Sequence, residues 1–158
     1  MLFRSVDVTV TALGGTSSTA GTGNDYRFVA VPMVDVVAPA SGPIAGGQSV
    51  TLTGTNFVNV TSVTFDGVTA TVLPGGTETS LTVMSPAHAI GTVEVRVTAA
   101  GGSSSTAGAG NDYRYYGVPT ITSLSPVRGP LGGTTVTITG TNLLGVTAIT
   151  FEIGRAHV

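Results

Sequence analysis

Short stretches in which apolar and polar residues alternate recur along the whole chain, and this period of two predicts β-strands rather than helices. In residues 48–54, Val50 and Leu52 fall on one face while Thr51 and Thr53 fall on the other. Clusters of Gly, Pro, Asn and Asp separate the stretches and indicate turns. The pattern predicts strands at residues 6–12, 25–30, 34–37, 48–54, 62–65, 68–73, 80–84 and 93–97, and one more strand around Tyr113 and Tyr115.

Each predicted strand offers alternate apolar side chains to a common core. The expected inward residues are Val50, Leu52, Val63, Phe65, Leu81, Val83, Val93, Val95, Val97, Tyr113 and Tyr115. Asp66-Gly67 indicates a hairpin, because a two-residue primed turn requires positive φ angles. Thr and Val, which suit half-buried pleated surfaces, are abundant, so the predicted fold class is all-β.

The chain repeats itself at a fixed spacing, which defines its structural unit. Residues 111–119 repeat residues 24–32 at an offset of 87 positions, and residues 93–99 repeat residues 6–12 at the same offset. Further on, residues 135–142 repeat residues 49–56 at an offset of 86. Self-similarity of this kind is typical of tandem domain arrays.

The repeat predicts how the chain divides into domains. Residues 32–117 are expected to form one complete domain of about seven short strands, the pattern of an immunoglobulin-like β-sandwich. Residues 1–31 supply the C-terminal strands of a truncated copy, and residues 118–151 supply the N-terminal half of a further copy. Because these partial copies expose strand edges, we expect the 158-residue chain to associate while residues 32–117 alone stay monomeric.

The two extreme ends look artificial. Residues 1–5 and 152–157 can be written in codons that are reverse complements over about 15 nucleotides, as in a sequencing adapter. We therefore interpret residues 1–5 and 152–158 as adapter-derived and expect the natural sequence to be residues 6–151, cut from a longer gene.

Composition narrows the function classes. The chain has no Cys, which excludes disulfides and thiolate metal sites. Its six basic and eight acidic residues give a net charge of −2, and no basic patch is visible, which argues against nucleic acid as a partner. No apolar run approaches the roughly 20 residues that a membrane-spanning helix needs.

The repeated motifs resemble the IPT/TIG family. The full pattern is an alternating strand into Ser125-Pro126, followed by Gly129-Pro130, Gly132-Gly133 and residues 136–142. The earlier copy departs slightly at residues 38–41. The resemblance implies an immunoglobulin-like β-sandwich without shared catalytic residues or cofactors. Tandem copies are typical of large bacterial cell-surface or secreted proteins, and related domains occur in animal receptors and DNA-binding transcription factors.

Few residues suggest chemistry. His88 has no visible triad or metal-ligand partners, so we interpret it as a surface residue. Asn24-Asp25, Asn111-Asp112 and Asp66 offer oxygen ligands for Ca²⁺, although Asn-Asp before a strand is more simply a turn. The Gly-rich stretches at residues 42–47 and 129–133 lack the helix and Lys of a phosphate-binding loop. We therefore expect no catalytic, cofactor or metal site.

One residue stands out as a candidate ligand contact. Alternation places Tyr113 and Tyr115 in the core and leaves Tyr116 available near the domain junction. An exposed Tyr can stack on a sugar, although packing or an interdomain contact is the simpler role. Asn59-Val60-Thr61 also matches a glycosylation sequon, which carries no information in a bacterium.

The linker between copies favours a structural role. Gly117-Val118-Pro119 leaves little slack, since Pro restricts itself and the preceding residue. Neighbouring repeats should then contact each other and form a semi-rigid rod. The leading hypothesis is a non-catalytic structural or adhesive segment of an extracellular or cell-surface bacterial protein, with a surface protein or glycan as target. The alternatives are an accessory, carbohydrate-binding module of an extracellular carbohydrate-active enzyme and, less favoured by charge, a DNA-binding domain.

Overall fold

The computed structural model describes residues 4–21 and 23–152. Most of the two ends interpreted as adapter-derived, residues 1–3 and 153–158, lies outside this described part. The chain divides into two compact units, Met1–Tyr115 and Tyr116–Val158. Apart from one 3-10 turn at Ala109–Asn111, every regular element in the described ranges is a β-strand, so the all-β prediction is confirmed.

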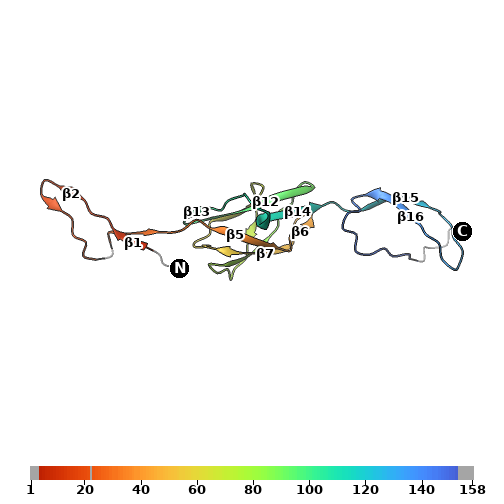
Figure 1. The fold of residues 1–158 in the computed structure, drawn as a ribbon, viewed down its shortest axis with the longest axis horizontal. Coiled ribbons are helices and arrows are strands. Elements are labelled where there is room, and N and C mark those ends of the chain that lie inside the picture. The colour runs from red at the N-terminus through yellow and green to blue at the C-terminus, as the bar shows by residue number, and fades with distance from the viewer. Residues whose placement is uncertain (1–3, 22, 153–158) are drawn as a thin grey trace. The chain divides into compact units, whose positions relative to one another are not determined.

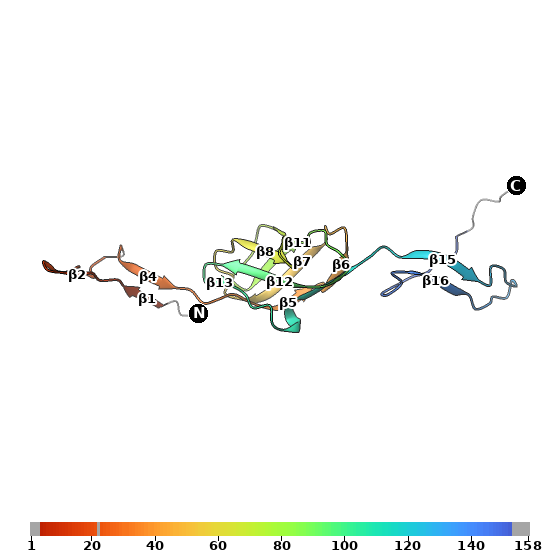
Figure 2. The same ribbon diagram turned by 90° about the horizontal axis from the view of Figure 1, so that it is seen from above.

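Residues 33–116 form a two-layered β-sandwich, called here the central sandwich, and all of these residues except Tyr116 belong to the first unit (Figure 1). One sheet has the strand order β10-β11-β7-β5, and the other has the order β6-β14-β12-β8-β9 with β13 paired to β12. The strands are β5 (Met33–Ala38), β6 (Ser41–Pro43), β7 (Ser49–Thr55), β8 (Ser62–Phe65), β9 (Val68–Thr69), β10 (Thr71–Val72), β11 (Ser80–Met84), β12 (Gly91–Ala99), β13 (Gly102–Ser103) and β14 (Asp112–Tyr116). Figure 2 shows the 3-10 turn Ala109–Asn111 beside β5. The immunoglobulin-like fold is thus the one predicted.

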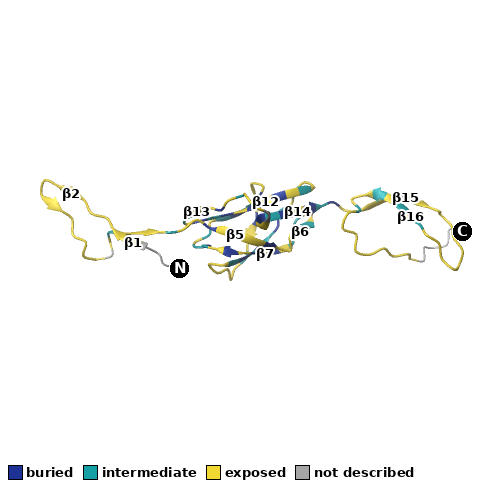
Figure 3. Ribbon diagram, viewed as in Figure 1, coloured by how far each residue is buried: buried dark blue, intermediate teal, exposed yellow. Residues whose placement is uncertain are grey.

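Alternation along the strands builds the core between the two sheets, as predicted. All eleven residues expected to point inward are buried, and the largest that are fully buried include Tyr113, Tyr115 and Phe65. The three rings pack edge to face, with the Phe65 centroid 5.1 Å from Tyr113 and 6.4 Å from Tyr115. Figure 3 shows the buried residues gathered in this sandwich.

The predicted strand at residues 68–73 is in fact two short strands. After the Asp66-Gly67 turn, where both φ angles are positive as expected, β9 pairs with β8 in one sheet. The chain then crosses over, and β10 pairs with β11 in the opposite sheet. Ala70 lies at the crossing and is buried in the core, and its N–H donates to the Val63 carbonyl oxygen at 2.9 Å.

The N-terminal part of the first unit holds β1 (Arg4–Asp7), β2 (Thr11–Ala12), β3 (Gly15–Thr16) and β4 (Asp25–Phe28). β1 pairs with β4, and β2 pairs with β3. The single strand predicted at residues 6–12 is therefore interrupted at residues 8–10, and the predicted strand 25–30 ends at Phe28. Val6, Val8, Val10, Tyr26 and Phe28 are exposed, since none of the sheets in the described residues of the first unit packs on them.

The second unit holds one antiparallel pair, β15 (Thr120–Ser125) with β16 (Thr137–Thr141). The pair corresponds to β5 and β7 by the sequence repeat, and it keeps the same irregularity. The register shifts between Ile121 and Ser123, as it does between Val34 and Val36 in the central sandwich. Local sequence therefore determines this bulge in both copies.

Candidate functional site

Two of the acids considered for Ca²⁺, Asp25 and Asp112, each lie directly across an antiparallel strand pair from another carboxylate. Asp7 faces Asp25 between β1 and β4, and Glu94 faces Asp112 between β12 and β14. A hydrogen bond with the Asp7 side chain, with smaller effects of burial and of the Asp7 charge, raises the pKa of Asp25. In residues 4–21 and 23–152, no group of three or more His, Asp or Glu side chains comes together as a metal site would require.

His88, interpreted from the sequence as a surface residue, is partly exposed and also packs against the core. Its ring stacks on Tyr115 at a centroid distance of 5.1 Å and is only partly exposed. Nε2 of His88 lies 3.7 Å from Oδ2 of Asp66, and its backbone N–H donates to the Ile44 carbonyl oxygen at 3.0 Å. The hydroxyl of Tyr115 donates to the Pro86 carbonyl oxygen at 2.8 Å, so this corner closes the end of the core.

Tyr116 is the last residue of β14 and is half-buried, one position beyond the fully buried Tyr115. Tyr113 is also fully buried, so neither of these rings can join Tyr116 in a sugar-stacking surface. The alternation predicted for these three residues is present in the structure. The role of Tyr116 in ligand binding remains a proposal.

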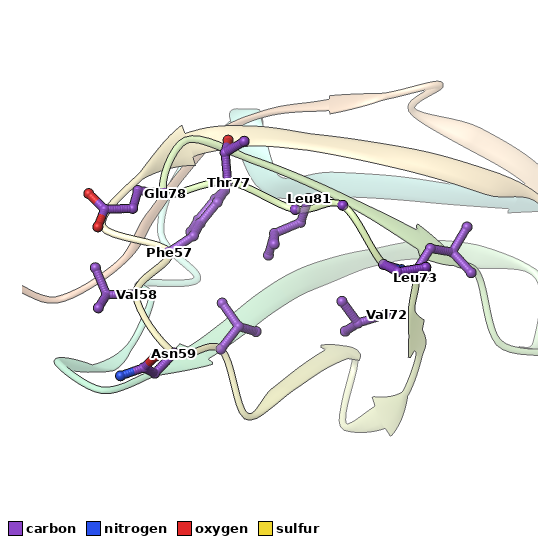
Figure 4. A pocket seen from close by; sticks show the side chains of 12 residues that line it. Phe57, Val58, Asn59, Val72, Leu73, Thr77, Glu78 and Leu81 are labelled. Atoms are coloured by element: carbon purple, nitrogen blue, oxygen red, sulfur yellow. The ribbon is translucent and has the colours of Figure 1, made fainter.

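A groove at one end of the central sandwich was not predicted from the sequence. It has a volume of about 430 Å³ and lies between the loop that follows β7 and the loop that joins β10 to β11. Figure 4 shows Phe57 and Leu81 on its apolar side, with Asn59, Thr77 and Glu78 among the other labelled lining residues. The loops meet through a hydrogen bond from the Phe57 N–H to the Glu78 carbonyl oxygen at 3.0 Å.

The groove offers little chemistry. Phe57 and Leu81 are buried, so no broad aromatic face is presented to a ligand. Its lining contains one carboxylate and no His, Arg, Lys or Cys, and therefore lacks the nucleophile and base pair that acyl transfer or hydrolysis requires.

A second feature that was missed recurs in two copies. The Asn that ends each Gly-Thr-Asn motif has a positive φ angle, 62° for Asn56 and 55° for Asn142. Nδ2 of Asn56 donates to the Val31 carbonyl oxygen at 2.9 Å, and Nδ2 of Asn142 donates to the Val118 carbonyl oxygen at 3.0 Å. Val31 and Val118 are the linker residues just before each copy, so each repeat holds its own entering linker through this Asn clamp.

The linker before the central sandwich also makes a close backbone contact. A Cβ at Gly101 would overlap the Ala30 carbonyl oxygen, so only Gly lets residues 29–31 lie against the turn between β12 and β13. The Gly54-Thr55-Asn56 motif was visible in the sequence, but only as a turn. The hydrogen bond from the Asn56 side chain to Val31 could not be predicted, because it depends on where the linker lies beside the turn.

The sandwich and these contacts define an immunoglobulin-like module in which an Asn side chain holds the linker that enters the repeat. The family model of the IPT/TIG domain matches residues 32–115 and 119–157, and the chain therefore belongs to the IPT/TIG family. Domains of this family are generally non-catalytic.

The chain is similar to parts of larger proteins. Human plexin-A3 is 30% identical over 123 residues, which is 77% of this chain but 6% of that protein, so the chain spans a small fraction of the curated relatives it matches. A structure of the plexin A4 full extracellular region overlaps 72% of this chain and 11% of its own, at 19% identity and a TM-score of 0.47. A gamma-CGTase from alkalophilic Bacillus clarkii overlaps 59% of this chain and 14% of its own, at 21% identity and a TM-score of 0.47.

Domains of this family occur in the extracellular regions of plexins. No helix in residues 4–21 and 23–152 has the length and hydropathy to cross a membrane.

Proposed function

We propose that the chain is a segment of a tandem array in a large bacterial cell-surface or secreted protein, where it serves as a non-catalytic structural and adhesive spacer outside the cell. The Asn clamp carries this proposal, since it ties the linker to the following repeat in both copies. A spacer must resist bending at its joints, and a hydrogen bond to a short Pro-containing linker restricts that bending. The partners are then the neighbouring repeats and, at the adhesive surface, a protein or glycan.

The surface composition supports the same role. Only 9% of residues are charged, and Thr, Ser and Gly make up much of the exposed surface. Such a surface favours neither nucleic acid nor a strongly charged substrate. The extracellular location of related domains in a plexin is consistent with an exposed array.

The Asn clamp is tested by Asn56→Gly, which keeps the positive φ angle accessible and removes the amide donor to Val31. We expect NMR order parameters of residues 29–31 to match the rigid sandwich, at about 0.85, and to fall below about 0.6 in the variant. Asn59→Gly is the matched control, because Asn59 also has a positive φ angle and lies outside the linker contact. A linker that is equally ordered in all three proteins would contradict the clamp.

The cellular role is tested by long-read sequencing of the source DNA outward from the codons of Val6 and Phe151. Further copies spaced by about 87 residues, with a signal peptide and an anchor, are expected for a surface array. A neighbouring catalytic domain would contradict the spacer role and make the chain an accessory module.

Tyr116 gives a separate test of the adhesive target. If a glycan is the target, Tyr116→Ala should weaken binding in a glycan-array assay, because a ring that stacks on a sugar contributes directly to affinity. Tyr26→Ala serves as the control, since Tyr26 lies on a different strand pair. Binding that is unchanged in Tyr116→Ala would remove Tyr116 from the adhesive surface.

A further inference from the structure

The entering strand β5 starts at one end of the central sandwich, called here the entry end. Met33, the first residue of β5, lies opposite Thr55, the last residue of β7, and the two strands pair antiparallel as far as Ala38 opposite Thr51. The Asn clamp holds the preceding linker at the same end, since Asn56 directly follows Thr55. A pull on the linker is therefore passed to the first residue of β5.

The leaving strand β14 finishes at the opposite end of the sandwich, called here the exit end. β11 ends at Met84 opposite Ser49, the first residue of β7, so the exit end is the end at which β7 begins. The Tyr115 hydroxyl donates to the carbonyl oxygen of Pro86, which follows β11, at 2.8 Å. β5 and β14 therefore run in the same direction, and Figure 2 shows the chain reaching the sandwich at one end and leaving it at the other.

Both terminal strands are held by hydrogen bonds that lie across the direction of such a pull. β5 pairs with β7, and β14 lies between β6 and β12. Next to β6, the Arg114 N–H donates to the Ala40 carbonyl oxygen at 2.9 Å. Because β6 follows β5 in the chain, tension on the two ends slides β6 and β14 past each other. Ladder hydrogen bonds run across their strands, so sliding loads them together, whereas sideways separation would break them one after another.

We propose that the central sandwich resists tension along the chain, and that the β5–β7 ladder and the β6–β14 contact carry this tension in shear. The core supports both places, since Val37 of β5 and Tyr115 of β14 are buried in it. Forced unfolding depends on the unfolding rate rather than on equilibrium stability, so this resistance is a property separate from the free energy of unfolding. Its biological use rests on the proposed function, because a surface array that is anchored at one end and bound at the other is under tension.

Single-molecule force spectroscopy of the full chain tests the proposal by pulling one protein in two directions. An Ala45→Cys variant supplies the only thiol, because the chain has no Cys. In the first geometry the variant is tethered by its two ends. In the second it is tethered by its C-terminal end and by the thiol at position 45. Ala45 is exposed in the turn between β6 and β7, at the exit end, so the second geometry peels β14 away from β6 instead of sliding it.

The end-to-end pull is expected to give one high-force event that releases residues 33–116, about 280–300 Å of extended chain at about 3.3–3.6 Å per residue. The pull from position 45 should unfold the sandwich at a clearly lower force, because its bonds then break in sequence. The unaltered chain pulled end to end is the control, and it should match the variant in that geometry. Equal forces in the two directions, or the absence of an end-to-end event, would overturn the proposal.

Arg114→Pro tests the β6–β14 contact itself. Proline has no N–H, so this variant loses the hydrogen bond to the Ala40 carbonyl oxygen. Arg114→Ala is the matched control, because it removes the same side chain and keeps the N–H. The end-to-end unfolding force should fall further in Arg114→Pro than in Arg114→Ala, and equal forces would overturn the role of this contact. The two pulling directions leave β14 unaltered, so they decide the proposal even where Arg114→Pro does not fold.

These outcomes are distinguishable from those of the test of the cellular role. A high end-to-end force in a chain whose gene also encodes an adjoining catalytic domain would overturn the spacer role and leave the tension-resistant sandwich in place. Equal forces in the two directions, in a chain whose gene encodes a tandem array, would overturn the tension-resistant sandwich alone.

Discussion

Residues 6–31 and 93–118 carry nearly the same sequence and share the same strand pairing, although the strand at residues 8–10 is interrupted, and their apolar side chains differ in exposure. The Val10 N–H donates to the Ser17 hydroxyl at 2.9 Å, and the Val97 N–H donates to the Ser104 hydroxyl at 3.0 Å. Val6 pairs with Tyr26, as Val93 pairs with Tyr113. The hairpin is thus determined locally, by turn chemistry and short-range hydrogen bonds.

The core is not determined locally. Tyr113 and Tyr115 are fully buried because β7, β8 and β11 complete the sandwich around them. Tyr26 and Phe28 have the same strand geometry and no such sheet. The comparison separates the origin of the hairpin's geometry from the origin of its stability. The local sequence determines the geometry, and burial against the other sheet supplies most of the free energy of folding.

The largest difference in the free energy of unfolding is expected between substitutions of two corresponding residues, Phe65 and Phe151. Phe65 is 0% exposed, and its counterpart Phe151 is 75% exposed. Phe65→Ala should lower the unfolding free energy of the central sandwich by about 3–5 kcal/mol, because it leaves a cavity in the core. Phe151→Ala should change it by less than about 0.5 kcal/mol. Urea unfolding followed by circular dichroism measures the free energy of unfolding of both variants. Similar losses in the two variants would contradict the assignment of Phe65 to the closed core and of Phe151 to an exposed surface.

A smaller difference is expected at the paired serines. Ser104→Ala leaves the buried Val97 N–H without its partner and should destabilise the sandwich by about 1–3 kcal/mol. In Ser17→Ala, water replaces the lost partner of Val10, so the change should stay within about 0.5 kcal/mol. The same unfolding assay compares them, and an unchanged stability in Ser104→Ala would show that this buried bond is not needed.

Replacing Tyr115 with Phe gives the central sandwich the residue that stands at the corresponding position 28 of residues 6–31. The loss of the hydrogen bond to Pro86 should cost about 1 kcal/mol near neutral pH. Burial, with a smaller effect of Tyr113, raises the pKa of Tyr115 to about 12 from an ordinary value of 10.0. The unfolded chain therefore loses the Tyr115 proton at a lower pH than the folded chain does. The contribution of neutral Tyr115 to the free energy of unfolding is fully present below pH 10.0 and is lost as the pH rises through about 12.

Tyr115→Phe should reduce this alkaline loss without removing it, because burial also raises the pKa of Tyr113. Unfolding measured between neutral and strongly alkaline pH, with tyrosinate absorbance as a second signal, checks the sign. A steeper alkaline loss in the variant than in the unaltered protein would contradict the assignment.

The smallest expected effect concerns the exposed carboxylates. Asp7→Asn removes the neighbouring acid that raises the pKa of Asp25 and should return that pKa toward 3.8. Carboxyl chemical shifts followed by NMR during a pH titration report it directly. A pKa of Asp25 that stays equally raised in the variant would contradict the assignment of the shift to Asp7.

Alternation predicted the inward residues because a strand's period of two depends only on its own sequence. The crossing at Ala70 was missed, since residues 68–73 alternate as one strand while their partners belong to two sheets. The stacking of His88 on Tyr115 and the bond from Asn56 to Val31 likewise join residues about 25 positions apart or more. The groove beside Phe57 depends on how two loops meet, which no single stretch of sequence records.

Amide hydrogen exchange of the full chain, at a concentration too low for association, tests most directly the claim that sequence sets the hairpin and burial sets its stability. Amides of residues 93–97 should be protected with a free energy close to that of global unfolding, whereas the counterparts at residues 6–10 should exchange almost as in an unfolded chain. Equal protection of the two regions in the monomer would contradict the account. It would show that the first segment is stabilised without the sheet that closes the central sandwich.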